Sequence, residues 1–163
     1  MNIEIRAYEQ NDSAEAVFIW NQIVDDGVAF PQLDLLTERS GDEFFSQQSF
    51  TGIAHDTDTH EIVGLYILHP NNIGRCGHIC NASYAVRKDV RGRRIGEQLV
   101  THCMDEARKL GFTILQFNAV VKSNERALRL YEKFGFVRLG VIPRGFLMKD
   151  GTYEDIILHY HEL

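Results

Sequence analysis

The sequence has few of the features that cross-link a chain, anchor it in a membrane or divide it into separate units. Its three cysteines are an odd number and too few for a disulfide framework, so we expect reduced thiols. Its three prolines are scattered and no Ser/Gly-rich tract occurs, which predicts one domain over residues 1–163. No run of about 18 apolar residues exists to span a bilayer. The opening stretch, MNIEIRAYEQ, lacks the apolar core of a signal peptide, so we expect a cytoplasmic protein.

A surplus of positive charge is also missing. The chain has 17 Lys+Arg against 23 Asp+Glu, a formal net charge of −6. This balance argues against nucleic acid and against an anionic membrane surface as partners. With 44% hydrophobic residues the chain can instead bury the core of a globular domain, and the composition excludes a disordered chain.

Hydrophobic residues recur at helical spacing in four segments, most clearly in Arg94–Leu110, and glycines follow three of the four. The predicted helices run from Asp12 or Ser13 to near Gly27, from Thr37 to about Gln48, from Arg94 to Leu110, and from Ser123 to Phe134.

Extended segments alternate with these helices. The predicted strands are Ile3–Tyr8, Phe50–His55, Ile62–Leu68, Gly77–Val86, Thr113–Val121, Phe136–Ile142 and Tyr153–Tyr160. Hairpins come first, then strand–helix–strand–helix–strand, then a closing hairpin. This order predicts an α/β fold with a mixed, partly antiparallel sheet of about six to seven strands and about four helices on both faces.

The segment Val86–Gly96, VRKDVRGRRIG, is the most informative part of the chain. A predicted strand ends there, a long helix begins, and the loop between them places five basic residues within eight positions: Arg87, Lys88, Arg91, Arg93 and Arg94. The helix N-terminus adds unpaired N–H donors and positive potential. Gly92 and Gly96 allow close approach of a ligand to the backbone. The loop therefore predicts a site for a diphosphate or polyphosphate, and the alternative is a solvated basic turn.

Two common phosphate sites do not match. A P-loop requires Gly-Lys-Ser/Thr where the helix opens, and this chain has Arg94-Ile95-Gly96-Glu97 there. A dinucleotide-binding fold requires G-x-G-x-x-G after its first strand, and the sequence contains no such string.

The loop resembles the acetyl-CoA pyrophosphate loop of the GNAT superfamily of N-acetyltransferases, Arg/Gln-x-x-Gly-x-Gly/Ala. Arg91, Gly92, Arg93, Arg94, Ile95 and Gly96 occupy its positions. One position departs from the pattern: Arg94 stands where the family usually has glycine. A side chain there leaves the backbone donors in place but changes how closely a ligand can approach.

A second segment, NERALRLYEKFGF, matches the family at the expected distance along the chain. The resemblance implies that Asn124 reaches the pantetheine arm, that Tyr131 lies near the CoA sulfur, and that the strand before the loop exposes backbone groups to the thioester. The implied cofactor contacts are Tyr84, Ala85, Val86, Arg91, Gly92, Arg93, Arg94, Ile95, Gly96, Asn124, Ala127 and Tyr131.

A narrower likeness involves Tyr66–Val86, Gln116–Asn118 and the closing YEDIILHYHEL. These segments resemble a bacterial branch that is similar to the yeast acetyltransferases acting on cyclic imino acids such as proline analogues. In that branch Asn81, Asn118 and Asn124 would surround the acetyl group and the acceptor.

Three residues are candidates for catalysis. The resemblance makes Tyr131 the acid that protonates or stabilises the CoA thiolate; the alternative is a packed core tyrosine. Asn118 interrupts an apolar strand, so we expect a buried amide that holds either the backbone or a ligand. Asn81 precedes the phosphate loop and has the same two interpretations. Neither asparagine can take a proton, so both would orient an amine, a carboxylate or a water.

The general base is not apparent. His78, Glu61 and Tyr84 are the nearby titratable candidates, and a water relay from backbone and asparagine groups is the alternative. Cys76 and Cys80 flank His78, but no second ligand pair follows, so we expect no metal. We expect the acceptor to face the N-terminal helices and two loops: Trp20, Phe30, the Asn71–Ile73 turn and the Pro143–Phe146 loop.

The resemblance implies an acetyl-CoA-dependent N-acetyltransferase that acts on a small-molecule amine: an amino acid, an imino acid or a polyamine. A backbone N–H near Tyr84–Val86 would hold the developing oxyanion. A silent CoA-binding sensor and a protein N-terminal or lysine acetyltransferase are the alternatives. Dimers are common in the family, so a homodimer is also implied, although no interface signature is present in the sequence.

Overall fold

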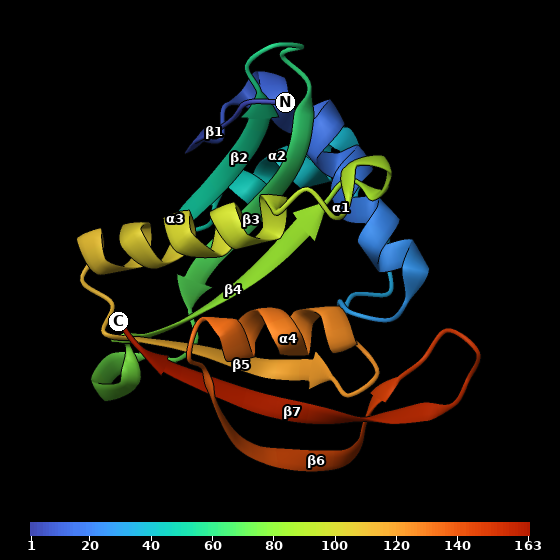
Figure 1. Cartoon of the computed structure of the whole chain (residues 1–163), viewed down its shortest axis with the longest axis vertical. Coiled ribbons are helices and arrows are strands. Elements are labelled where there is room, and N and C mark those ends of the chain that lie inside the picture. The colour runs from blue at the N-terminus through green and yellow to red at the C-terminus, as the bar shows by residue number, and fades with distance from the viewer.

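The computed structural model describes all 163 residues and arranges seven strands in one mixed sheet of order β1-β2-β3-β4-β5-β7-β6 (Figure 1). Every neighbouring pair is antiparallel except β4 and β5, which are parallel. The strands are β1 (Ile3–Ala7), β2 (Phe50–Asp56), β3 (Ile62–Pro70), β4 (Ile79–Val86), β5 (Ile114–Val121), β6 (Val137–Leu147) and β7 (Tyr153–Glu162). The α-helices are α1 (Ser13–Asp26), α2 (Glu38–Ser46), α3 (Ile95–Lys109) and α4 (Glu125–Lys133). The predicted fold class and all predicted elements are confirmed.

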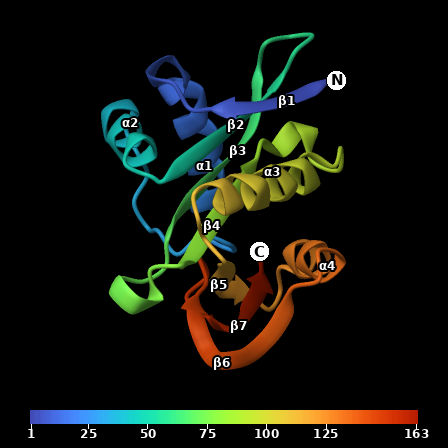
Figure 2. The same cartoon turned by 90° about the vertical axis from the view of Figure 1, so that its left-hand side faces the viewer.

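The helices cover both faces of the sheet (Figure 2). On one face α1 and α2 enclose a core around Trp20, Phe45 and Leu65. On the other face α3 and α4 enclose a larger core around Leu99, Leu115 and Phe117. No helix is both long enough and apolar enough to cross a membrane.

Local signals explain the helix ends. Gly27 terminates α1 in the left-handed conformation, at φ 63°, which glycine adopts without a Cβ clash. Thr37 caps α2 by accepting a hydrogen bond from the Ser40 N–H at 3.1 Å. Asn124 caps α4 in the same way, because its Oδ1 accepts from the Ala127 N–H at 3.2 Å.

The sheet opens between its two parallel strands. β4 and β5 pair only at Ile79–Ile114 and Cys80–Leu115, although both strands continue for several residues beyond these pairs. Figure 1 shows them diverging from this point, with α3 above the opening and α4 beside it. The backbone groups along this edge are therefore free to bind a ligand.

One predicted loop is a strand. The stretch Pro143–Phe146 lies inside β6, an edge strand that pairs only with β7. An edge position tolerates the missing N–H of proline. The irregularity that the sequence suggested is present as a register shift between Ile142 and Phe146, with Arg144 at φ 56°.

Candidate active site

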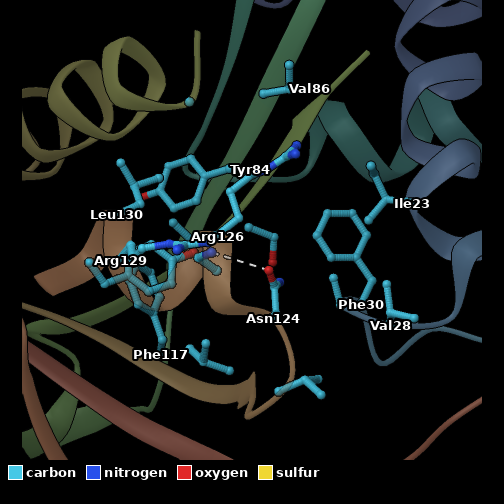
Figure 3. A pocket seen from close by; sticks show the side chains of 18 of the residues that line it. Ile23, Val28, Phe30, Tyr84, Val86, Phe117, Asn124, Arg126, Arg129 and Leu130 are labelled. Carbon is cyan, nitrogen blue, oxygen red and sulfur yellow. Dashed lines mark hydrogen bonds between the residues drawn. The ribbon is translucent and has the colours of Figure 1, made fainter. Parts of the chain in front are cut away.

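A cavity of about 810 Å³ lies where β4 and β5 diverge. Figure 3 shows side chains from both faces of the sheet converging on it. It is lined by Ile23, Asp26 and Val28–Pro31 from the end of α1; by Asn81–Tyr84 and Val86 of β4; by Arg91, Gly92 and Arg94–Glu97 of the basic loop and α3; by Phe117–Val121 of β5; and by Asn124, Arg126, Ala127, Arg129–Tyr131 and Lys133 of α4 and its cap.

The cavity has two chemically different parts, which we name the basic lobe and the neutral lobe. The basic lobe lies on the α3/α4 side and contains Arg91, Arg94, Arg126, Arg129 and Lys133. The neutral lobe lies on the α1 side. Its wall is formed by Val28–Pro31, Asn81, Ser83, Asn118 and Ala119. Because alternate residues of a strand face opposite sides, Asn81 and Ser83 share the face of Ala85, which packs in the α1/α2 core.

The backbone of β4 presents hydrogen-bonding groups to the opening between the lobes. The Arg87 N–H donates to the Val63 carbonyl at 2.9 Å. Because hydrogen bonding alternates along an antiparallel pair, this bond determines which residues of β4 direct their backbone groups toward β3. Residues 81, 83 and 85 therefore bond to β3. The N–H and C=O groups of Ala82, Tyr84 and Val86 point toward β5, which has already diverged. These groups form an unpaired polar edge along the cavity.

The start of α3 supplies the basic lobe with further donors. The first intrahelical bond of this helix runs from the Gln98 N–H to the Arg94 carbonyl at 3.3 Å, which leaves the N–H groups of residues 95–97 without intrahelical partners. Such groups, with the positive end of a 15-residue helix behind them, form an anion site.

The five basic side chains of the loop have different environments. Arg87 bonds to Glu61 at 3.1 Å and to Asp89 at 2.8 Å, and Lys88 pairs with Asp26 at 2.6 Å. Neither lines the cavity.

Among the three arginines predicted at the phosphate, Arg91 lines the cavity and lies 3.7 Å from the Asp26 carboxylate. Arg93 does not line it; the Arg93 guanidinium approaches the Met1 sulfur at 3.9 Å. Arg94 lines the cavity, and its side chain has no hydrogen-bond or ion-pair partner in the chain. The prediction for Arg93 is thus not supported by its position.

Tyr131 lines the cavity from α4 and rests on a group of aromatic rings. Its ring packs on Phe117 at 4.4 Å, on Phe136 at 5.5 Å and on His159 at 5.7 Å. Its hydroxyl makes no hydrogen bond within the chain. Burial raises the pKa of the Tyr131 phenol well above its usual range, so the group stays protonated and can donate.

Asn118 is exposed rather than buried, contrary to the sequence expectation. Phe117 faces the α3/α4 core, so Asn118 points to the opposite face, into the neutral lobe. Its Nδ2 donates to Asn71 Oδ1 at 2.5 Å, and its Oδ1 accepts from Gln116 Nε2 at 3.0 Å. Asn71 therefore positions Asn118 without lining the cavity. Asn81 also lines the neutral lobe, where its Oδ1 accepts from the Ala82 N–H at 2.7 Å.

Several other predicted residues lie away from the cavity. Ala85 is fully buried against α1, on the same face of β4 as Asn81 and Ser83, and does not line the cavity. Trp20 is 1% exposed and packs against Phe30 with ring centroids 4.4 Å apart, so only Phe30 reaches the neutral lobe. The Asn72–Ile73 turn and the Pro143–Phe146 stretch do not line it.

None of the predicted bases fits its role. His78 and Glu61 do not line the cavity, and Glu61 is paired with Arg87. Tyr84 does line it, but its hydroxyl is buried without a hydrogen-bond partner. Burial raises the pKa of this phenol far above its usual range, which excludes it as a base near neutral pH.

Sequence reasoning missed several polar lining residues, among them Asp26, Ser83, Arg126 and Arg129. Arg126 and Arg129 were visible as an i, i+3 pair inside the second motif. Asp26 also left a signal, because two acidic residues end α1 where the helix dipole disfavours them. Ser83 left none.

The comparisons with known proteins agree with this geometry. Residues 8–136 match the model of the acetyltransferase (GNAT) family, so the chain belongs to that family. It is an N-acetyltransferase that uses acetyl-CoA.

Individual relatives are similar over most of their length. The N-acetyltransferase aca1 of Schizosaccharomyces pombe is 29% identical over 158 residues, which cover 86% of this chain and 76% of that protein. A GCN5-related N-acetyltransferase from Kribbella flavida superposes with a TM-score of 0.90 at 28% identity and covers 99% of this chain and 98% of its own. A phosphinothricin acetyltransferase from Sinorhizobium meliloti, solved with acetyl-CoA, shares the fold at a TM-score of 0.91 and 18% identity, with coverage of 100% and 89%.

Proposed function

We propose that the protein transfers the acetyl group of acetyl-CoA directly to the amine of a small molecule, an amino or imino acid in preference to a polyamine. The observation that carries this proposal is the cavity that joins a basic lobe and a neutral lobe at an unpaired strand edge, with a protonated tyrosine in its wall.

The basic lobe has the chemistry that a nucleotide pyrophosphate requires. Arg91, Arg94 and the free N–H groups at the start of α3 would hold the two phosphates. The unpaired edge of Ala82, Tyr84 and Val86 would hold the amide groups of the pantetheine arm as a strand would. When bound, acetyl-CoA supplies an activated acyl group, a thioester.

Two groups of the chain act on the reacting atoms in this proposal. A backbone N–H among Ala82, Tyr84 and Val86 donates to the carbonyl oxygen as negative charge develops on it. The Tyr131 hydroxyl donates its proton to the departing sulfur, as its raised pKa allows. The amine nitrogen forms the new C–N bond as the C–S bond breaks, and the nitrogen loses its extra proton to solvent.

The residues that line the neutral lobe favour an amino or imino acid over a polyamine as the acceptor. No histidine lines the cavity, and its only carboxylates are Asp26 and Glu97, of which Asp26 is paired and Glu97 bonds Lys133 at 2.8 Å. The amine is therefore taken up as the free base. A polyamine would find no carboxylate in the neutral lobe for its remaining ammonium groups. The Asn81 and Asn118 amides suit a carboxylate or a hydroxyl of a compact acceptor.

One resemblance supports the choice of acceptor. The segments Tyr66–Val86, Gln116–Asn118 and the closing YEDIILHYHEL resemble a bacterial branch that is similar to the yeast acetyltransferases acting on cyclic imino acids.

The test is release of CoA thiol from acetyl-CoA in the presence of amino acids, proline analogues, polyamines and peptides with free N-termini. We expect release with amino or imino acids, and loss of most of it in Tyr131→Phe. Release only with peptides would identify a protein acetyltransferase. Binding of acetyl-CoA without release from any acceptor would identify a sensor. Either result would overturn the proposal.

A further inference from the structure

We propose that the Ser83 hydroxyl is a catalytic group of the acetyl transfer. It accepts a hydrogen bond from the attacking amine and thereby directs the nitrogen lone pair toward the thioester carbon. The inference deepens the proposed function and rests on it. Ser83 lines the neutral lobe and lies outside both the phosphate loop and the α4 motif.

The first observation is the hydrogen bonding of the polar side chains in the neutral lobe. Asn81 Oδ1 accepts from the Ala82 N–H at 2.7 Å. The Asn118 amide is bonded to other side chains through both its Oδ1 and its Nδ2. The Ser83 hydroxyl makes no hydrogen bond within the chain, and it is the only polar side chain of this lobe without one. A hydroxyl can accept as well as donate, so this group is available to a ligand.

The second observation is the place of Ser83 beside the unpaired edge of β4. Its backbone bonds to β3, where it pairs with Ile67, so its position on the strand is fixed. The next residue, Tyr84, directs its N–H into the opening. The Ala82 N–H is already held by the Asn81 side chain, so the Tyr84 N–H is the first free donor along this edge. A carbonyl oxygen bound by this N–H would bring the thioester carbon next to Ser83.

The third observation is the distribution of side chains over the two faces of β4. Ser83 is on the face of α1, in the neutral lobe, whereas Tyr131 lines the cavity from α4 and packs in the core of the opposite face. In the proposed function the acceptor occupies the first face, and the CoA sulfur leaves beside Tyr131. The Ser83 hydroxyl is therefore on the side from which the amine attacks, opposite the leaving group.

The small size of residue 83 also fits a contact with a ligand. β4 is an inner strand of the sheet, where β-branched and aromatic residues pack best, and its partner Ile67 is buried. Ser83 is half-buried and leaves space between β4 and α1 that a valine or an isoleucine would fill. The sequence thus keeps room for an acceptor at the position that also offers a free hydroxyl.

The hydrogen bond to Ser83 becomes stronger as the reaction proceeds. The nitrogen gains positive charge while the C–N bond forms, which makes its N–H a better donor to Ser83 Oγ. Ser83 keeps its own proton throughout. The C–S bond breaks, and the nitrogen loses its extra proton to solvent, as in the proposed function. Because the contact stabilises the transition state more than the bound acceptor, its loss should lower kcat more than it raises KM.

The decisive variant is Ser83→Ala, which removes the hydroxyl and keeps the strand pairing. We expect kcat for thiol release with an amino or imino acid to fall about tenfold, as the loss of a hydrogen bond to a developing charge implies. The acceptor KM should change by less than about threefold, and the calorimetric affinity for acetyl-CoA should stay unchanged. An unchanged kcat would refute the proposal. Loss of acetyl-CoA affinity by the same factor as kcat would also refute it, because it would show a structural effect on the whole cavity.

A matched pair of variants separates the hydroxyl from the shape of the side chain. Ser83→Thr and Ser83→Val add the same bulk, and only the first keeps a hydroxyl. The threonine variant should therefore turn over about tenfold faster than the valine variant. Equal rates in the two variants would show that residue 83 acts through its size alone and would overturn the proposal.

Two further comparisons complete the test. Ser49→Ala removes an exposed hydroxyl outside the cavity and should leave kcat unchanged; a loss equal to that of Ser83→Ala would refute a specific role for Ser83. If the wild-type protein released thiol with none of the acceptors, the proposed function itself would fail. Release by the wild type together with full activity of Ser83→Ala would contradict only the role of Ser83.

Discussion

The two lobes of the cavity share one strand edge but would recognise their ligands by different means. The basic lobe is formed by a loop, two helix N-termini and several cations, so it attracts an anion before any close contact forms. The neutral lobe offers amides, a hydroxyl and apolar surface from α1, β4 and β5, so it discriminates at contact distance. In the proposed function, charge captures acetyl-CoA, and shape with hydrogen bonding selects the acceptor. Tyr131 would lie where the two substrates meet.

The largest effect on activity is expected from a substitution of Tyr131. Tyr131→Phe removes the proton donor but keeps the ring on Phe117, so kcat should fall about 100-fold with unchanged acetyl-CoA affinity. The rate of thiol release gives kcat, and calorimetric titration gives the affinity for acetyl-CoA. An unchanged kcat would remove Tyr131 from the chemistry, and a parallel loss of affinity would reduce it to a packing residue.

The pH profile tests the neutral lobe. Because no histidine lines the cavity and the Tyr131 pKa is raised, the enzyme should contribute no titration between about pH 6 and 9. The value of kcat/KM should then rise about tenfold per pH unit below the pKa of the acceptor amine and level off above it. An additional inflection near pH 6.5, at the same position for acceptors of different amine pKa, would reveal an enzymatic base that the two lobes do not show.

Arg91→Ala should affect only the basic lobe. Loss of its contact should weaken acetyl-CoA binding about tenfold and leave the KM of the acceptor unchanged. Raising the ionic strength to about 0.5 M should weaken wild-type acetyl-CoA binding in the same direction, since exposed charges are screened. If salt raised the acceptor KM equally, the division into a charged and a neutral lobe would be wrong.

Asn118→Ala is the matching change in the neutral lobe. Truncation removes one neutral hydrogen-bonding side chain, so the acceptor KM should rise about fivefold while acetyl-CoA affinity stays the same. Asn72→Ala is the control, because Asn72 is an exposed amide of the neighbouring turn that does not line the cavity. Similar effects of the two substitutions would show that the turn, rather than Asn118, matters.

The smallest effect on acetyl-CoA binding is expected from a substitution of Asp26, at the boundary between the two lobes. The Asp26 carboxylate holds Lys88 and lies near Arg91, where it would compete with an incoming phosphate. Asp26→Asn should therefore tighten acetyl-CoA binding about threefold. Asp25→Asn makes the same charge change on a neighbouring residue that bonds Lys149 and does not line the cavity. Equal tightening in both variants would indicate a general charge effect instead of competition for Arg91.

The sequence predicted the basic lobe better than the neutral lobe, and the reason is physical. The basic lobe consists of contiguous segments whose glycines, cap and arginines act locally, so Arg91–Gly96 and Asn124–Tyr131 could be recognised as strings. The neutral lobe forms only when α1, β4 and β5 pack together.

Particular residues show where local reasoning failed. Trp20 is buried by Phe44 and Phe45 of α2, a contact that no spacing within α1 reveals. Asn118 is exposed because β5 leaves the parallel pairing after Leu115 and shifts register between Phe117 and Val120. Arg93 and Arg94 are neighbours in the sequence, and only the left-handed turn at Arg94 determines which of them faces the cavity.

A crystal structure of the protein with CoA and the acceptor found by the panel tests the central claim most directly. The account predicts the pyrophosphate on Arg91, Arg94 and the first N–H groups of α3, the pantetheine between β4 and β5, the sulfur near Tyr131, and the acceptor between Phe30 and Asn118. Phosphates bound away from the α3 N-terminus, or an acceptor on the same side of the sheet as the phosphates, would contradict it.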